Sequence, residues 1–419
     1  MYRQIKNCRI CDGNLKEVLN LGKLYPSGFI GDEYGFKNQK APLVLSKCLN
    51  CGLVQLKHTV QLDTMYRQYW YSSSLNKSMV GSLRDVAEGV EARIELNDLD
   101  TVIDIGCNDG TLFTLYTNNN IEKVGYDPAL NLASDAKEHC DYFFNDYFSS
   151  NNWFEGKKAK VITAIAMFYD LEDPNKFLND VVEVLDENGI FVVQFTDLMS
   201  MFRIMAFDNI CHEHLEYYTL EVLSNLFSQH GLEIFDVEQN DVNGGSMRAY
   251  ACFTGKRKIS SNVEIALMKE TWYFNIESFL SFENKIGMYK STILHFLAKA
   301  GMEDKTIFVL GASTKGNTLL QYFGITDSII PYAAEVNKEK FGLKTLGSDI
   351  IIIREEDALK LNPDYLLVLP WHFIDTFIEN LGAYLEKGGK LIVPMPIPCV
   401  IEKIGEEIVW TLLTKQLES

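Results

Sequence analysis

Two cysteine pairs near the start of the chain, and a glycine turn that follows them, constrain this sequence more than any other feature. The pairs are Cys8-x-x-Cys11 and Cys48-x-x-Cys51, and the turn is Asp104-Ile-Gly-Cys-Asn-Asp-Gly110. Each pair forms a tight turn that directs two sulfurs at one point, so two pairs create a tetrahedral site of four thiolates. Zn²⁺ accepts that geometry without strain. Because such a site is closed, we expect a structural and not a catalytic zinc.

Other uses of these cysteines fit the sequence less well. The gap between the pairs is wider than in common zinc ribbons, but the cost of closing a loop grows slowly with its length. Disulfides suit secreted chains, whereas the opening Met1-Tyr-Arg-Gln lacks the apolar segment of a signal peptide. A redox site would need one pair only, at a strand-to-helix junction. The remaining cysteines are expected to be reduced: Cys107, Cys140, Cys211, Cys252 and Cys399.

Composition sets the class of the protein. The chain has 419 residues, of which 47% are hydrophobic and 23% charged, which is typical of two or three well-packed domains. Its formal charge of −18 repels nucleic acid and anionic membranes. No apolar run reaches transmembrane length. We therefore expect a cytoplasmic monomer or homodimer with neither nucleic-acid nor membrane partners.

The order of apolar runs and turns predicts an α/β protein of three parts, with a zinc-binding domain at 1–75. Residues 76–255 alternate strand and helix, which predicts a parallel, doubly wound sheet. A long helical span, 262–301, then leads into a second α/β unit within 256–419. The expected strands are 101–105, 124–127, 161–166, 190–195 and 306–310, with more near Ile329, Ile350, Tyr365 and Lys390; the expected helices are 110–117, 129–139, 174–185 and 317–323.

The glycine turn predicts the cofactor. Asp104 ends an apolar strand, and Gly106 and Gly110 bracket a turn at the sheet edge where doubly wound folds bind ligands. The turn lacks the second glycine of G-x-G-x-x-G, so it suits a ligand without phosphate. Asp127, at the end of the next strand, is placed to accept hydrogen bonds from ribose hydroxyls, and Asn145-Asp146 lies where an adenine contact is expected. This order predicts S-adenosylmethionine, although each aspartate taken singly is also a plausible helix cap.

A dense polar segment, Asp208-Asn-Ile-Cys-His-Glu-His-Leu-Glu-Tyr-Tyr218, predicts acid–base chemistry. An imidazole is the best proton acceptor at neutral pH, and Glu213 or Glu216 could hold its tautomer. Tyr217 and Tyr218 could donate to a developing oxyanion. A metal held by His212-x-His214 and a buried structural histidine pair remain alternatives.

Two further segments carry groups that suit a carbohydrate and a phosphate. Tyr69-Trp-Tyr71-Ser-Ser-Ser74 combines aromatics and hydroxyls, which is typical of a carbohydrate surface, although such clusters are also found in cores. The Ser313-Thr-Lys315-Gly-Asn317 turn could offer backbone N–H groups and one cation to a diphosphate. Its alternative is an ordinary turn of a Rossmann-like unit.

A series of motifs spans nearly the whole chain and carries a family resemblance. The motifs are Cys8/Cys11/Cys48/Cys51, Tyr71-Ser-Ser, Asp104-Ile-Gly-Cys-Asn-Asp-Gly110, Ala166-Met-Phe-Tyr-Asp170, Ile210-Cys-His-Glu-His214, Asn243-Gly-Gly-Ser246 and Gly311-Ala-Ser-Thr-Lys-Gly-Asn-Thr318. In this order they resemble the bacterial sugar C-methyltransferases with an N-terminal zinc domain, which act on nucleotide-linked 4-keto-6-deoxy hexoses. The resemblance implies a central class I methyltransferase domain that binds S-adenosylmethionine. It also implies a C-terminal Rossmann-like domain that helps to hold the nucleotide sugar.

The resemblance also implies roles for single residues. His214 matches the proposed base, with Glu213 beside it and His212 as its rival, and Tyr71 matches an active-site tyrosine. Cys211 departs from the tyrosine that several antibiotic-sugar relatives carry. The expected cofactor-binding residues are Asp104, Gly106, Asn108, Gly110, Asp127, Asp146 and Ala166, and the expected substrate-binding residues are Tyr71, Asn243, Ser313, Lys315 and Asn317.

These roles imply C-methylation through an enolate. His214 would remove the C3 proton of the sugar, Tyr71 or another donor would stabilise the enolate, and C3 would accept the methyl group. Two other functions stay open: an O- or N-methyltransferase on another small metabolite, and a non-catalytic assembly protein.

Overall fold

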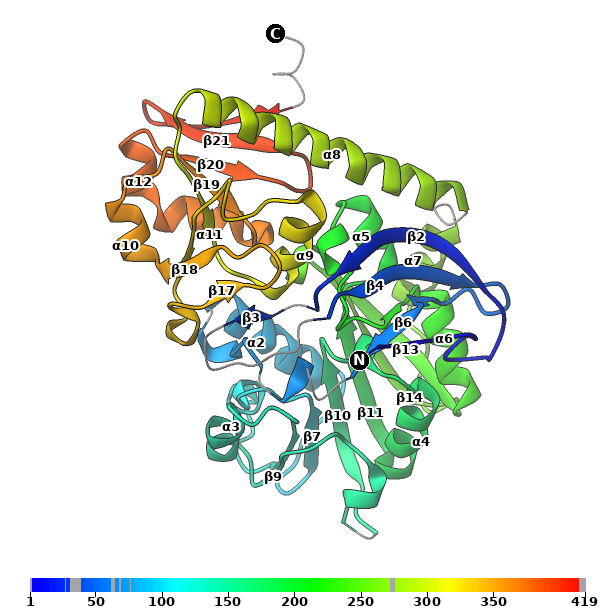
Figure 1. Ribbon diagram of the computed structural model, residues 1–419. Coiled ribbons are helices and arrows are strands. Elements are labelled where there is room, and N and C mark those ends of the chain that lie inside the picture. Colours follow the sequence, from blue (N-terminus) through cyan, green and yellow to red (C-terminus); the bar gives the residue numbers. More distant parts are fainter. Residues whose placement is uncertain are drawn as a thin grey trace.

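The computed structural model describes residues 2–26, 28–30, 39–61, 65–67, 69–75, 77–154, 156–271 and 276–413. Three sheets organise these ranges: a four-stranded sheet, a seven-stranded sheet and a nine-stranded sheet. They occupy three regions of the molecule, with the long helix α8 (Ile276–Met302) running over the N-terminal and C-terminal sheets (Figure 1). The expectation of an α/β protein in three parts is confirmed.

The N-terminal sheet is antiparallel. Strands β2 (Leu15–Leu24), β4 (Ala41–Cys48) and β5 (Val54–Leu56) pair in sequence order, and β1 (Tyr2–Gln4) pairs separately with β6 (His58–Val60). The fourth strand comes from far along the chain, since β12 (Glu216–Tyr217) pairs with β5. The N-terminal sheet is therefore completed by the segment that carries the predicted base.

The central sheet has the order β13-β14-β11-β10-β7-β8-β9. The predicted strands are confirmed as β7 (Thr101–Ile105), β8 (Glu122–Tyr126), β10 (Ala159–Ile165) and β11 (Leu185–Phe195), which run parallel with β9 (Tyr142–Phe144) at the edge. The sheet is mixed, however, because β13 (Leu232–Asn240) and β14 (Ser246–Phe253) are antiparallel. The expectation of a parallel sheet was wrong at this edge, where a direct hairpin replaces a helical crossover.

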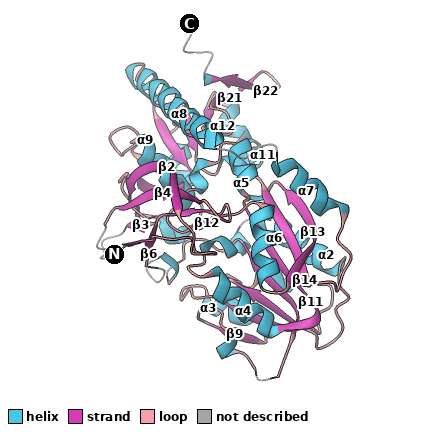
Figure 2. Cartoon of the chain, turned by 90° about the vertical axis from the view of Figure 1, so that its right-hand side faces the viewer, coloured by secondary structure: helices cyan, strands magenta, loops and turns pink. Residues whose placement is uncertain are grey.

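Successive side chains of the central strands point to opposite faces of the sheet, and both faces are buried. Val102 packs into the core beneath α2 (Lys77–Glu91), while its neighbour Ile103 packs into the opposite core. That second core includes α4 (Pro174–Val184), a predicted helix that Asp173 caps at its N-terminus, and α6 (Leu220–Gln229) (Figure 2). The carboxyl ends of β7, β8 and β10 are thereby brought to one edge.

Two predicted helices are shorter than expected, both beside the glycine turn. The segment 110–117 contains only the 3₁₀ turn η2 (Thr111–Leu115), because Gly110 has a left-handed φ of 77° and Tyr116 is extended. The helix expected at 129–139 begins at Ala133, as α3 (Ala133–His139). The Asp127 carboxylate accepts the N–H of Ala129 and so holds this backbone in a turn.

The C-terminal sheet has the order β22-β21-β20-β19-β15-β16-β18-β17-β3. Its last strand is N-terminal, since β3 (Phe29–Ile30) pairs with β17 (Lys344–Thr345). The remaining elements are β15 (Ile307–Leu310), α9 (Thr314–Phe323), β16 (Tyr332–Glu335), β18 (Ile351–Arg354), α10 (Glu355–Lys360), β19 (Tyr365–Val368), α11 (Ile374–Asn380), α12 (Gly382–Glu386), β20 (Lys390–Val393), β21 (Cys399–Ile404) and β22 (Glu407–Leu412).

Three details of this part differ from the sequence-based expectation. The strand expected near Ile329 begins at Tyr332. Helix α9 begins at Thr314 and not at Asn317, because the Ser313 side chain caps it by accepting the N–H of Gly316. The long helical span contains α7 (Ser261–Thr271) and α8, and residues 272–275 between them lie outside the described ranges. No helix within those ranges is both long and apolar enough to cross a membrane.

Candidate functional site

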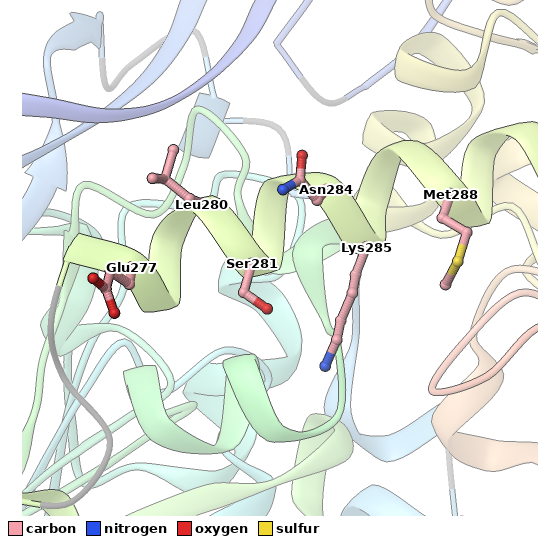
Figure 3. Close-up of a pocket in the computed structure, with 6 residues that line it drawn as sticks. All are labelled: Glu277, Leu280, Ser281, Asn284, Lys285 and Met288. Atoms are coloured by element: carbon pink, nitrogen blue, oxygen red, sulfur yellow. The ribbon is translucent and has the colours of Figure 1, made fainter.

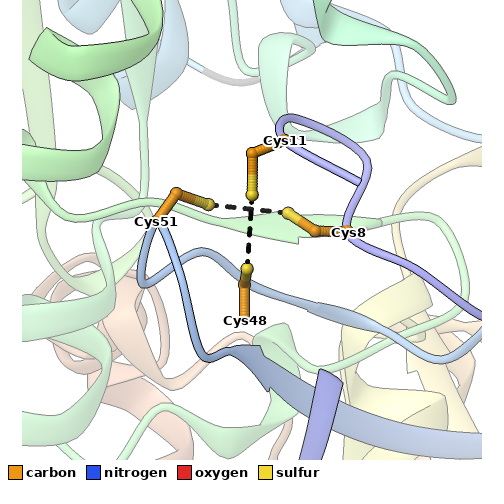
Figure 4. Close-up of side chains that lie close together, drawn as sticks. All are labelled: Cys8, Cys11, Cys48 and Cys51. Carbon is orange, nitrogen blue, oxygen red and sulfur yellow. Dashed lines mark hydrogen bonds between the residues drawn. The ribbon is translucent and has the colours of Figure 1, made fainter. Parts of the chain in front are cut away.

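The four N-terminal cysteines converge on one point. The Sγ atoms of Cys8 and Cys51 are 3.5 Å apart, as are those of Cys11 and Cys48 (Figure 4). A zinc ion with Zn–S bonds of about 2.3 Å sets the edges of a sulfur tetrahedron at roughly 3.8 Å. The spacing of the thiols therefore fits a tetrahedral zinc site with no open position.

We expect metal analysis of the purified protein to find one zinc per chain. Cys48→Ser should lower soluble yield and zinc content, because a structural zinc contributes its binding free energy to folding. Cys140→Ser, which changes a half-buried cysteine outside the cluster, is the matched control and should retain zinc. Well-folded protein without bound metal would contradict the assignment.

The first aspartate of the predicted cofactor site ends β7 and is almost fully buried. The Thr163 hydroxyl donates to Asp104 Oδ1 at 2.6 Å. Burial raises the pKa of Asp104 to about 7, against the lowering effect of that hydrogen bond. Gly106 follows with a φ of 74°, and a Cβ there would lie 3.1 Å from the Met167 side chain. The backbone is thus free to approach a ligand where a side chain would obstruct it.

The second aspartate ends β8 and holds the glycine turn closed. Asp127 accepts the N–H of Asn108 at 2.8 Å through one oxygen and the N–H of Ala129 at 2.8 Å through the other. Burial raises its pKa to about 6, while these two hydrogen bonds lower it. Each carboxylate oxygen keeps a second acceptor position, so Asp127 can brace the turn and still accept ribose hydroxyls.

The remaining predicted cofactor residues differ in their surroundings. Ala166 directly follows β10 with a left-handed φ of 56°, and its N–H donates to Gln194 O at 2.8 Å. Asp146 is more than half exposed and accepts the N–H of Tyr147 at 2.9 Å. The neighbouring Asn145 side chain donates to the backbone carbonyls of Asp127 and Ala129, so it shapes the turn.

The serine segment that follows Tyr71 is fastened to the glycine turn. The Asn108 side chain donates to Tyr71 O at 3.0 Å and accepts the N–H of Ser73 at 2.9 Å. Asp109 accepts from the Ser72 hydroxyl and from the N–H of Ser74 at 2.7 and 2.8 Å. The Tyr71 hydroxyl is buried and has no hydrogen-bond partner in the described part of the chain.

We call the segment Asp208–Tyr218 the base loop. Within it, Nδ1 of His214 lies 2.8 Å from the carbonyl oxygen of Asn209. A carbonyl only accepts, so Nδ1 carries the hydrogen and Nε2 carries the lone pair. Burial and the Lys315 cation lower the pKa of His214 to about 3, so the ring is neutral at pH 7. The Tyr169 ring packs edge-on at 4.4 Å between centroids. His214 is thus a fixed imidazole of defined tautomer.

A cation and a carboxylate accompany this imidazole. Lys315 Nζ donates to the side-chain oxygen of Asn209 at 3.1 Å. Burial raises the pKa of Glu213 to about 7, while Lys315 lowers it. Potential ligand atoms of Cys211, Glu213 and His214 lie within 4.8 Å of one another, but the nearby ammonium opposes binding of a metal cation there. The cluster is suited to proton transfer next to a developing negative charge.

The second histidine of the loop faces away from this cluster. His212 Nε2 lies 3.1 Å from Ala41 O on β4, and the side chain is fully buried. Burial lowers its pKa to about 4. The structure therefore separates the two histidines: His212 joins the loop to the N-terminal sheet, and His214 faces the cationic Lys315.

The turn that was predicted to bind a diphosphate is the first turn of α9, and each of its polar residues has a different partner. The Ser313 hydroxyl caps the helix, and the Asn317 side chain is fully buried and donates to Gly28 O at 2.8 Å. Lys315 alone reaches the base loop. Asn243 lies in the 3₁₀ turn η6 (Val242–Gly244), which packs against Trp371, since a Cβ on Gly244 would lie 2.7 Å from that ring.

Sequence reasoning missed several neighbours of this cluster. Trp371 Nε1 donates to Asp208 Oδ2 at 3.0 Å, and the Tyr66 hydroxyl donates to Glu213 O at 3.0 Å. Burial, followed by the Lys315 charge, holds the pKa of His372 well below its usual value. Burial also raises the pKa of Asp170. Trp371-His372 lies just beyond the carboxyl end of the apolar strand β19, and a search of strand ends, as used for Asp104, could have found it.

A separate groove lies on the outer face of α8. It has a volume of about 430 Å³ and is lined by Glu277, Leu280, Ser281, Asn284, Lys285 and Met288, all from this one helix (Figure 3). None of these residues belongs to the cluster around His214, so the groove plays no part in the candidate site.

Comparison with known proteins gives matches along the whole chain. Family models match residues 8–66 as a zinc binding domain, 82–237 as a methyltransferase domain and 241–396 as a C-methyltransferase C-terminal domain. The C-methyltransferase NovU of Streptomyces niveus is 30% identical over 411 residues, covering 96% of this chain and 98% of its own length.

Solved structures match about two fifths of the chain. Magnesium protoporphyrin IX methyltransferase from Synechocystis PCC 6803, with bound S-adenosylmethionine, covers 42% of this chain and 79% of its own at 12% identity and a TM-score of 0.33. An S-adenosylmethionine-dependent methyltransferase from Clostridium acetobutylicum covers 42% and 92%, with 12% identity and a TM-score of 0.33.

Proposed function

Because this chain belongs to the zinc-containing, S-adenosylmethionine-dependent C-methyltransferases, we propose that it methylates a nucleotide-linked 4-keto-6-deoxy hexose at C3. The protein is an enzyme that uses S-adenosylmethionine and carries zinc. Neither a non-catalytic assembly role nor O- or N-methylation fits membership of this family. The sugar nucleotide and the methylated carbon are the parts that we propose.

The observation that carries the proposal is the state of His214. A carbon next to a ketone gives up its proton only to a positioned base, whereas methyl transfer to an amine needs little more than orientation. The bond from Nδ1 to Asn209 O leaves the lone pair on Nε2, so this nitrogen is the one that can accept a proton. A fixed imidazole of this tautomer, next to a buried lysine, is the arrangement on which we base the proposal.

We assign roles to the residues around this imidazole as follows. His214 Nε2 accepts the C3 proton, and Glu213 and Asp208 both interact with Lys315. The Lys315 ammonium and the unpartnered Tyr71 hydroxyl are the donors available to the enolate oxygen at C4. When bound, S-adenosylmethionine supplies an electrophilic methyl group, and Asp104 and Asp127 hold this cofactor at the ends of β7 and β8.

Turnover of a panel of sugar nucleotides tests the proposal. The panel combines GDP, dTDP, UDP and CDP with 4-keto-6-deoxy hexoses, and mass spectrometry with NMR locates the added methyl group. The matched control is each sugar reduced to the 4-hydroxyl, which cannot form an enolate. We expect a C3-methylated product from at least one ketone and none from its reduced form. Equal methylation of the reduced sugar, or methylation on oxygen, would contradict the proposal.

A further inference from the structure

The base loop is built on the N-terminal sheet. Immediately after His214, Leu215 accepts the N–H of Leu56 at 2.8 Å through its carbonyl oxygen. The next two residues form β12 and pair with β5, and two residues before His214 the His212 ring is bonded to Ala41 O. The segment that carries His214 is therefore fixed on both sides by strands β4 and β5. Elsewhere the loop is held by the N–H of Leu215, which donates to Tyr169 O at 2.8 Å, and by the bonds of Lys315 and Trp371 to Asn209 and Asp208.

A buried ion pair joins the same loop to the cysteine cluster. Arg9 lies inside the first knuckle, between Cys8 and Cys11, and its Nε is 3.5 Å from Glu216 Oε1 on β12. The two side chains are 2% and 0% exposed. Arg9 also donates to the Thr59 hydroxyl at 2.7 Å, and its backbone N–H donates to the Gln55 side chain at 2.9 Å. The guanidinium is thus held by Thr59 on β6 and, through a longer contact of 3.5 Å to Leu56 O, by β5.

Glu216 depends on this arginine. Neither of its carboxylate oxygens accepts a hydrogen bond from the residues that the structure describes, and Arg9 is the cation with which it pairs. Burial raises the pKa of Glu216 and Arg9 lowers it, so loss of Arg9 leaves Glu216 either to take up a proton or to leave its position, and both change its contacts on β12.

We propose that Arg9 is a positioning residue through which the zinc knuckle holds the base loop in its catalytic place. Zinc fixes the turn from Cys8 to Cys11, the turn fixes Arg9, and Arg9 fixes Glu216 two residues after His214. The zinc site then determines where the base stands, in addition to stabilising the N-terminal sheet. That this placement serves catalysis rests on the function proposed above, whereas the placement itself does not.

Amide hydrogen exchange of the zinc-loaded protein, read on peptides that span 209–217, tests the placement without any substrate. For Arg9→Met we expect exchange in these peptides to quicken at least tenfold, while zinc content and the peptides of β7 and β8 stay as in the wild type. Arg9→Met/Glu216→Gln removes both buried charges and should restore most of the protection. Arg3→Met is the matched control, since Arg3 lies in the same domain as Arg9 and pairs with Glu172 but is largely exposed.

Kinetics then separate positioning from general stability. Arg9→Met should lower kcat with methyl acceptor and leave KM for S-adenosylmethionine unchanged, and Arg9→Lys should fall between it and the wild type. The proposal is overturned if residues 209–217 exchange in Arg9→Met as slowly as in the wild type. It is also overturned if the double variant is no better protected from exchange than Arg9→Met. If Arg9→Met does not fold, Glu216→Gln and the double variant carry the same comparison. If Arg9→Met shows the expected faster exchange but the wild-type protein methylates no sugar nucleotide, the proposed function is refuted and the placement of the base loop by Arg9 stands.

Discussion

Replacing His214 by Asn is expected to lower turnover roughly 10²- to 10⁴-fold, the usual contribution of a positioned acid–base group. The reason is geometric. The Asn209 carbonyl fixes the tautomer that leaves Nε2 unprotonated, and no amide can accept a proton at neutral pH in its place. Because the side chain lies in the base loop and not at the ends of β7 and β8, binding of S-adenosylmethionine should change little. Steady-state kinetics and titration calorimetry measure the two quantities.

His212→Asn is the control for this variant. Its ring lies against Ala41 O in the N-terminal sheet, so the substitution should reduce stability more than it reduces the rate of the folded fraction. If His212→Asn abolished turnover while His214→Asn spared it, the two roles would be reversed. If both variants turned over normally, proton abstraction would belong to another group, and Tyr71 would be the first to test.

Lys315→Met is expected to lower turnover roughly 10²- to 10³-fold, comparable with the loss of one donor to an oxyanion. Two effects combine in this variant. The enolate oxygen loses its cation, and Asn209 loses the hydrogen bond that Lys315 Nζ makes to its side chain, so the residue that orients His214 is less well held. Lys315→Arg keeps the charge and should retain more activity than the methionine variant.

The pH profile distinguishes this electrostatic role from simple loss of packing. Lys315 lowers the pKa of both His214 and Glu213, whose values are about 3 and about 7. Removing the cation favours the protonated form of each group, so both pKa values rise. The acid limb of kcat should therefore move to higher pH in Lys315→Met and stay in place in Lys315→Arg. If the acid limb of the kcat profile stays in place in Lys315→Met, Lys315 does not act on these groups.

The features that the sequence predicts well are local ones. Cys8-x-x-Cys11 and Cys48-x-x-Cys51 each make their turn within four residues, so spacing alone indicates where the sulfurs point. Asp104 lies near the end of one apolar strand and Asp127 directly follows the next, and a parallel sheet brings such strand ends to one edge whatever the rest of the chain does. For the same reason the main strands of the central sheet are recognisable from their apolar runs.

The features that the sequence does not predict are set by packing between distant segments. Lys315 meets Asn209 across 106 residues, and Trp371 meets Asp208 across 163. The sequence predicted that Lys315 lies in a turn that binds a diphosphate. In the structure, the Ser313 cap starts the helix earlier, so Lys315 lies on the helix and reaches the base loop. The two-residue strand β12 is too short to show any alternation, yet its pairing with β5 places His214 between two domains.

Deuterium incorporation at C3 of the sugar, measured without methyl transfer, tests the central claim most directly. The enzyme is incubated in D₂O with the accepted 4-keto sugar nucleotide and S-adenosylhomocysteine, and the sugar is analysed by NMR and mass spectrometry. The account predicts one deuterium at C3 with the wild-type enzyme and, with His214→Asn, incorporation slowed in proportion to its loss of turnover. Two results would contradict proton abstraction by His214. In the first, the wild-type enzyme methylates the sugar but exchanges its C3 proton no faster than the buffer control. In the second, His214→Asn exchanges that proton at the wild-type rate.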